Sequence, residues 1–394
     1  MNSTKRNVAV LAACQALLFT NNSTLIAING LAGLALAPYI GLATLPVTCW
    51  VLGGAIGTMP ASLHMKRVGR QRGLTTGTLW GVVGALICAS AIWAQSFWLL
   101  CFGTLVFGVY NAYGQYYRFA AADVASADFK STAISLVLAG GLVGGVLGPT
   151  SSRWTIELLA PKFMGAYLVL IGFAVMTMIL LRFIRIPTPS AAEASAAGRP
   201  LSQIAAQPKF IVAVLAGAIG YGVMNFLMTS TPIAMLACGH VYGDAAFVIS
   251  SHIIGMFAPS FVSGPLIKRF GALPVMFCGA LLNLAAIATA LSGLAVAQFW
   301  YSLVFLGVGW NFLYVGGTTL LTETYRPEER AKAQGTNEQA IFIMMAISSL
   351  TSGLTVTTAG WERVNLFALP LVGVVAIAIV WYALHSRAQK GAAA

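Results

Sequence analysis

Two pairs of side chains with soft donor atoms lie in neighbouring apolar stretches of the sequence. Met224 and Met228 are four residues apart, and so are His252 and Met256. On a helix, residues four apart lie on one face, so each pair presents two donor atoms in the same direction. Thioether sulfur and imidazole nitrogen are uncharged ligands that suit Cu(I) better than they suit Mg, Ca or Mn. The spacing therefore predicts a copper site formed by Met224, Met228, His252 and Met256.

Packing is the competing interpretation of these four residues, because methionine often fills gaps in apolar helices. The chain holds 13 methionines, so a single methionine pair at this spacing carries little weight alone. His252 points to function more strongly, since an ionisable residue inside a membrane span is costly. Both interpretations stay open from the sequence, and we predict the metal site.

The elements that position these residues are apolar helices. Hydrophobic residues make up 58% of the 394 residues and charged residues only 8%, far from the proportions of soluble domains. Apolar stretches of about 20 residues or more recur, each long enough to cross a bilayer as a helix. We therefore predict an all-α membrane protein with twelve transmembrane helices. The predicted spans cover residues 8–33, 40–64, 73–95, 97–120, 130–153, 163–185, 208–238, 244–267, 272–292, 297–320, 333–357 and 363–385.

The net charge of +12 is distributed unevenly between the two sides of the predicted membrane. Nineteen of the 22 Lys and Arg residues fall on the side of the N-terminus, and only Arg153, Lys162 and Arg363 fall on the other. Basic loops stay in the cytoplasm, so we predict a multi-pass protein of the lipid bilayer with both termini cytoplasmic. A nucleic-acid partner is not expected, because that needs a basic patch on a folded face.

The second half of the chain repeats the first. Lys66 and Lys268 occupy similar loops, as do Lys130 and Lys332, and both pairs are 202 positions apart. A constant offset at two loops indicates a duplication into two pseudo-symmetric six-helix bundles. The positions 202 residues before the four predicted ligands hold no Met or His. These ligands therefore belong to the second half alone.

A stretch rich in small residues and proline separates the two halves. Between residues 186 and 207 the chain contains three prolines among Ala, Ser, Thr and Gly, the composition of a linker. We predict an N-terminal bundle at 1–185, a cytoplasmic linker at 186–207 and a C-terminal bundle at 208–394.

The loop after the second span resembles the signature loop of the major facilitator superfamily. Arg67, Gly69 and Arg70 match that signature, whereas Lys66 stands where the family has Asp. The segment 325–332, Tyr-Arg-Pro-Glu-Glu-Arg-Ala-Lys, resembles the family's loop between helices ten and eleven. The resemblance implies the major facilitator fold, with a substrate site near the membrane midplane.

Within that superfamily, the methionine and histidine pairs resemble those of the CcoA-type copper importers. That family has Met-x-x-x-Met in its seventh helix and His-x-x-x-Met in its eighth, the places of the four residues here. The resemblance implies copper import by alternating access, with copper as substrate and not as cofactor, and with no enzymatic activity. It also implies the bacterial inner membrane as the location and periplasmic or cytoplasmic copper carriers as partners. Cys49 and Cys238 resemble the family's redox-sensitive cysteines.

The main alternative is a proton-coupled transporter or exporter of a small organic molecule. The glycines at 140–148, followed by Pro149, resemble part of the antiporter signature of drug exporters, although close helix packing also explains them. Proton coupling uses Asp, Glu or His within spans. The ten acidic residues fall in predicted loops or at span ends, so only His252 is expected to serve such a cycle. A receptor that transports nothing is a third class that fits the composition.

Overall fold

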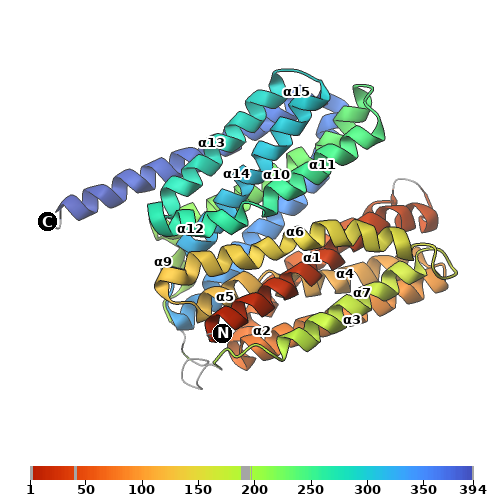
Figure 1. Ribbon diagram of the computed structural model, residues 1–394, viewed down its shortest axis with the longest axis horizontal. Coiled ribbons are helices and arrows are strands. Elements are labelled where there is room, and N and C mark those ends of the chain that lie inside the picture. The colour runs from red at the N-terminus through yellow and green to blue at the C-terminus, as the bar shows by residue number, and fades with distance from the viewer. Residues whose placement is uncertain (1–2, 40–41, 188–195, 197, 393–394) are drawn as a thin grey trace. The chain divides into compact units, whose positions relative to one another are not determined.

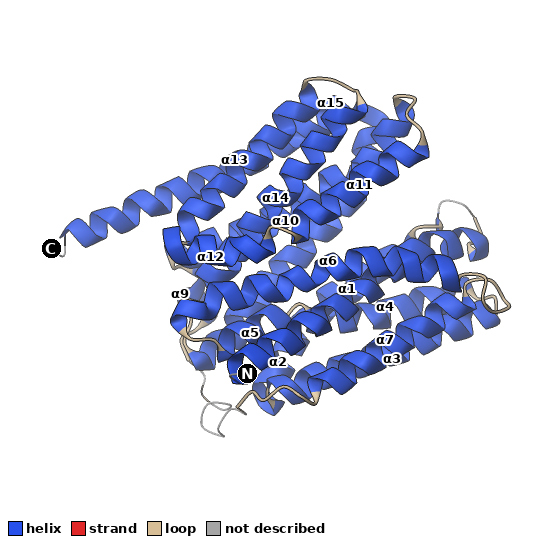
Figure 2. Ribbon diagram, in the orientation of Figure 1, coloured by secondary structure: helices blue, strands red, loops and turns tan. Residues whose placement is uncertain are grey.

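The computed structural model describes residues 3–39, 42–187, 196 and 198–392, and this part of the chain is helical without any strand. Figure 2 shows helices joined by short connections. Helices are expected in lipid, because each backbone N–H and C=O must find a partner within its own segment. The prediction of an all-α membrane fold is confirmed.

The chain divides into two compact units. The first comprises Met1–Ser126, Leu136–Ala197 and Arg330–Phe342, and the second comprises Ala127–Ser135, Gly198–Glu329 and Ile343–Ala394. Two short segments, 127–135 and 330–342, therefore group apart from their neighbours in sequence. The bundles at 1–185 and 208–394 stay a prediction, and residues 188–195 and 197 of the predicted linker lie outside the described residues.

The first unit is built from long helices and one short one (Figure 1). Its helices are α1 (Ser3–Leu36), α2 (Leu45–Val68), α3 (Arg70–Trp93), α4 (Phe97–Gly114), α5 (Tyr117–Val124), α7 (Met164–Leu181) and most of α6 (Lys130–Thr155). Ser96 caps α4, since its hydroxyl oxygen accepts a hydrogen bond from the Leu99 N–H. The core of the unit forms where α4 packs against α2 and α3, and α7 packs against α1 and α3.

The second unit contains the helices of the predicted metal site. Its helices are α9 (Leu201–Ala205), α10 (Pro208–Ala237), α11 (Tyr242–Phe257), α12 (Ser260–Phe270), α13 (Ala272–Leu291), α14 (Val296–Leu321) and most of α15 (Arg330–Ala392). Short 3-10 turns precede α6 and α15, at Ala127–Phe129 and Pro327–Glu329. Helix α14 packs against α10, α11 and α13, so it forms the centre of this unit.

Ten helical segments of the described chain are long and apolar enough to cross a membrane. The last of them, 327–386, contains two of the twelve predicted spans, because α15 is interrupted at Gly360 with φ 82° and ψ 173°. Helix α2 matches the predicted span 40–64 but is not among the ten. Together these account for the twelve predicted helices.

Two glycines that the duplication pairs have the same backbone conformation. Gly69 lies between α2 and α3 with φ 88° and ψ 160°, and Gly271 lies between α12 and α13 with φ 88° and ψ 163°. Residues with a side chain rarely adopt this region, so glycine is needed at both turns. The two positions are 202 residues apart, the offset found for the lysines.

Glycines bring the backbones of α2 and α4 into direct contact. A methyl group on Gly53 would overlap the carbonyl oxygen of Leu105, and one on Gly57 would lie 3.2 Å from the Cα atom of Val109. A methyl group on Gly108 would overlap the backbone of α2 in turn. We call this contact the α2–α4 seam. It leaves no room for a side chain at Gly53 or Gly108, and at Gly57 a methyl group would fit only if its neighbours moved slightly.

We expect Gly53→Ala to destabilise the protein by about 1–3 kcal/mol, because the added methyl group forces the two backbones apart. Gly172→Ala in α7 is the matched control, since nothing lies within 4 Å of a methyl group there. The control should be neutral or stabilising by up to about 1 kcal/mol, from the better helix propensity of alanine. Thermal unfolding of the purified proteins in detergent measures both. Equal melting temperatures for the two variants would contradict the close contact.

Candidate functional site

All four predicted metal ligands lie in the second unit. Met224 and Met228 are on α10, and His252 and Met256 are on α11. Met228 is half-buried, and the other three are buried. Helix α11 packs far more extensively against α14 than against α10. Whether the four side chains bind a metal therefore stays a prediction.

His252 is fixed against α14. Its Nδ1 atom lies 2.7 Å from the carbonyl oxygen of Leu303, which can only accept, so we assign a proton to Nδ1. The Nε2 atom of the neutral ring is then an acceptor, and it is buried without a hydrogen-bond partner among the described residues. One turn later, the side-chain amide of Asn311 donates to the carbonyl oxygen of Met256 at 2.7 Å. His252 thus has one nitrogen, Nδ1, that is fixed by a hydrogen bond, and another, Nε2, that can accept a further one.

Four aromatic rings gather beside these residues, where α10, α11 and α14 meet. Trp310 and Tyr314 stack with their centroids 4.8 Å apart and their planes at 19°. The ring of Tyr221 meets both edge-on, at 5.3 Å and 5.5 Å, and Phe257 meets Trp310 edge-on at 5.8 Å. We call Tyr221, Phe257, Trp310 and Tyr314 the aromatic cluster. Its rings have the offset and edge-to-face arrangements that aromatic side chains prefer.

Tyr221 is the most exposed residue of the aromatic cluster. It is half-buried, whereas the other three rings are buried. Asn225 lies one helical turn further along α10, is also half-buried, and donates to the hydroxyl of Ser348 at 2.8 Å. A planar ligand could therefore meet a ring and an amide on the same face of α10. The sequence carried a signal for this face, since Tyr221 and Asn225 have the same four-residue spacing as the methionines.

The first unit contains a buried ion pair that the sequence analysis missed. Arg118 donates to Oε1 of Glu338, and the two side chains are 1% and 0% exposed. Asn337 donates to the same oxygen at 2.7 Å, while Oε2 is buried without a partner among the described residues. The sequence placed Glu338 at the end of a span, yet its side chain is fully buried. Burial within the protein does not place Glu338 deep in the membrane, so the prediction that the acidic residues lie in loops or at span ends is not tested by it.

Arg70, from the signature loop, belongs to a second charged group in the same unit. Its Nε atom donates to Asp123 at 2.9 Å, and Arg330 donates to the same carboxylate oxygen at 3.1 Å. Arg70 also donates to the side-chain oxygen of Gln334. Lys66, which replaces the family's Asp, instead donates to the backbone carbonyl oxygen of Ala196 at 2.7 Å. The loop thus keeps a charge network without the usual acidic residue.

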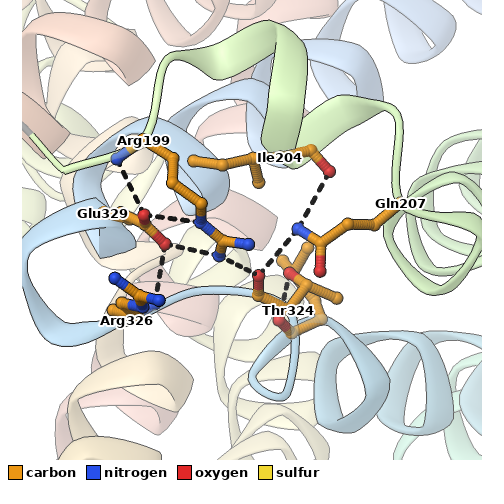
Figure 3. Close-up of polar contacts among 7 residues, drawn as sticks. Arg199, Ile204, Gln207, Thr324, Arg326 and Glu329 are labelled. Atoms are coloured by element: carbon orange, nitrogen blue, oxygen red, sulfur yellow. Dashed lines mark hydrogen bonds and ion pairs between the residues drawn. The ribbon is translucent and has the colours of Figure 1, made fainter.

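The end of the linker is bound to the turn that precedes α15 (Figure 3). The buried carboxylate of Glu329 accepts bonds from the Arg199 backbone N–H at 2.8 Å and from its Nε and Nη2 atoms at 2.7 Å each. The Arg326 N–H is a fourth donor, at 3.0 Å. These bonds raise the pKa of Arg199, so the guanidinium stays charged. Gln207 adds a bond to the carbonyl oxygen of Thr324, and residues 198–207 are thereby fixed to the second unit.

We expect Glu338→Ala to destabilise the protein by about 3–5 kcal/mol, because it removes the carboxylate that neutralises the buried guanidinium of Arg118. Lys162→Ala is the matched control, since its pair with Glu157 is 57% and 74% exposed and is worth at most about 1 kcal/mol. Thermal unfolding in detergent measures both variants. A loss for Glu338→Ala as small as that of the control would show that the buried pair contributes nothing.

Comparisons with known proteins agree with this architecture. The family model of the Major Facilitator Superfamily matches residues 11–243 and 223–394. The riboflavin transporter RfnT of Brucella anthropi is 39% identical over 395 residues, covering 99% of this chain and 98% of the relative. The uncharacterized MFS-type transporter YddS of Bacillus subtilis is 29% identical over 360 residues, covering 86% and 82%. The crystal structure of FucP, the Escherichia coli fucose:proton symporter, in its outward conformation has a TM-score of 0.79 at 16% identity, covering 96% and 99%.

The resemblance to the CcoA-type copper importers is not confirmed by these relatives, whereas the superfamily is. The residues that match the superfamily's family model span nearly the whole chain, and the relatives are named as transporters. The orientation of the termini stays a prediction. This chain is a multi-pass membrane transporter, not an enzyme, and it belongs to the major facilitator superfamily.

Proposed function

We propose that this transporter carries riboflavin, or a planar heteroaromatic molecule closely related to it, across the membrane by alternating access. The observation that supports this most strongly is the 39% identity to a riboflavin transporter over 99% of the chain. Riboflavin belongs to the class of small organic molecules that the sequence analysis held as the alternative to copper.

The aromatic cluster suits such a substrate chemically. Riboflavin has a flat, neutral tricyclic ring with carbonyl and N–H groups along one edge, so it needs stacking and neutral hydrogen bonds rather than a charged partner. Tyr221 offers a ring face or edge, and Asn225 offers an amide one turn away. Sites for small molecules are typically apolar with a few polar groups that fix the ligand's orientation. The arrangement on α10 has this character.

Copper import is the less supported function. The methionine and histidine spacing predicted it, but the relative with a named substrate carries riboflavin. Met224, Met228, His252 and Met256 remain a predicted metal site that requires its own test. His252 also remains a candidate for binding a proton or a substrate N–H, because its Nε2 atom is an acceptor without a partner among the described residues.

We expect riboflavin uptake through the wild-type protein, with a KM about 2- to 10-fold higher for Tyr221→Ala. The loss of one stacked aromatic contact, worth about 0.5–1.5 kcal/mol, gives this factor. Tyr221→Phe keeps the ring and should keep most of the affinity. The measurement is uptake of labelled riboflavin by a riboflavin auxotroph that has no other transporter.

Tyr301→Ala is the matched control, since Tyr301 lies on α14 with 51% of its surface exposed. It should leave the KM unchanged. No riboflavin uptake by the wild-type protein, at normal levels in the membrane, would contradict the proposed substrate. Uptake with equal KM values for all three tyrosine variants would instead contradict the role of Tyr221 alone.

The same cells test the metal site when total cell copper is measured. If the four residues bind copper, Met228→Ala and His252→Ala should reduce its accumulation relative to wild type, because each removes a soft ligand. Met228→Leu is the sharper variant, since it keeps the volume and loses the sulfur. If none of the three variants changes the copper level, the four residues only pack the helices and do not bind copper.

A further inference from the structure

Two cysteines lie at matching positions beside the α2–α4 seam. Cys49 is the fifth residue of α2, and Cys101 is the fifth residue of α4. The seam pairs Gly53 with Leu105 and Gly57 with Val109, and both pairs are 52 positions apart. Cys49 and Cys101 are also 52 positions apart and lie one turn before the first of these pairs. The register of the two helices therefore places the cysteines side by side.

The close packing of the seam makes a covalent link between the two side chains feasible. A disulfide needs Cα atoms only about 4.4–6.8 Å apart, which is short for two packed helices. The glycines of the seam remove that obstacle, because they let the backbones touch one turn away.

The accessibility of the two thiols differs in a way that suits a two-step exchange. Cys49 is half-buried and is therefore the more exposed of the two, whereas Cys101 is only 6% exposed. In thiol–disulfide exchange an accessible thiolate attacks first, and a protected neighbour resolves the mixed disulfide. The remaining thiol near this site, Cys88 on α3, is fully buried and lies against Gly103 of α4.

We propose that Cys49 and Cys101 form a redox-active dithiol site that closes to a disulfide across the start of the α2–α4 seam. The oxidant is a disulfide donor of the glutathione or protein-disulfide class. The Cys49 thiolate attacks the donor disulfide, forms a mixed disulfide and releases one donor thiol. The Cys101 thiolate then attacks the Cys49 sulfur and releases the second. Two protein thiols lose two electrons, the donor gains them, and the two protons leave with the released thiols.

The disulfide would connect two helices of one unit and enclose the chain between them. It shifts α2 and α4 from a contact held by packing to one held covalently. The proposal concerns the first unit and does not depend on which substrate is transported. It also differs from the pairing of Cys49 with Cys238 that the copper-importer resemblance implied.

The test counts free thiols in the full-length protein purified in detergent. The variant C238S/C278S removes the two exposed cysteines and leaves Cys14, Cys49, Cys88 and Cys101. After treatment with reduced or oxidised glutathione, the protein is acid-quenched, unfolded and labelled with maleimide-polyethylene glycol. We expect four adducts after reduction and two after oxidation. Peptide mass spectrometry should find a linked Cys49–Cys101 peptide that is two hydrogens lighter than its parts.

Single substitutions identify the pair. Adding C49S or C101S should abolish the loss of two adducts, whereas adding C88S should leave it unchanged. Four adducts after oxidation, a stable glutathione adduct on Cys49 alone, or a link to Cys88 would each overturn the proposal. Peptide mass spectrometry of the C238S/C278S variant identifies the linked cysteines directly. It therefore tests the proposal even if one of the added substitutions prevents folding.

Discussion

The structure depends on the rule that a polar group buried away from water must find its partner within the chain. Arg118 and Glu338 are the clearest case, because an isolated charge at either position would be far too costly to bury. Their pairing fixes the start of α15 within the first unit. The bonds from Arg70 and Arg330 to Asp123, and from Arg199 to Glu329, follow the same rule at other helix ends. Charge is scarce in this chain, and much of it is used to hold elements in place.

The helices themselves followed from the sequence, because hydropathy and length are properties of single segments. Apolar stretches gave the spans, and the fixed offset between Lys66 and Lys268 anticipated the matching conformations of Gly69 and Gly271. The break in α15 was predicted as well, since Gly360 falls in the gap between the predicted spans 333–357 and 363–385. The division of the predicted span 97–120 was not, because α4 ends at Gly114 and α5 begins at Tyr117 without a polar stretch between them.

The candidate site was predictable only in part, because it depends on contacts between distant segments. The four-residue spacing placed Met224 and His252 correctly on α10 and α11, but spacing reports one helix at a time. The approach of Tyr221 to Trp310 joins positions almost 90 residues apart. Glu338 was missed for a similar reason, since its burial follows from Arg118, 220 positions earlier. Local patterns identified residues capable of chemistry, while the fold determined which of them meet.

The α2–α4 seam has a mechanical consequence. Helices separated by large side chains can slide or tilt as those side chains change rotamer, so the two helices can move relative to each other. At Gly53 and Gly108 there are no side chains to rearrange, because one backbone lies directly on the other. These two helices should therefore move together as one rigid body. A force applied at the loop end of either helix would be carried along both, and any bending within the first unit would have to occur elsewhere.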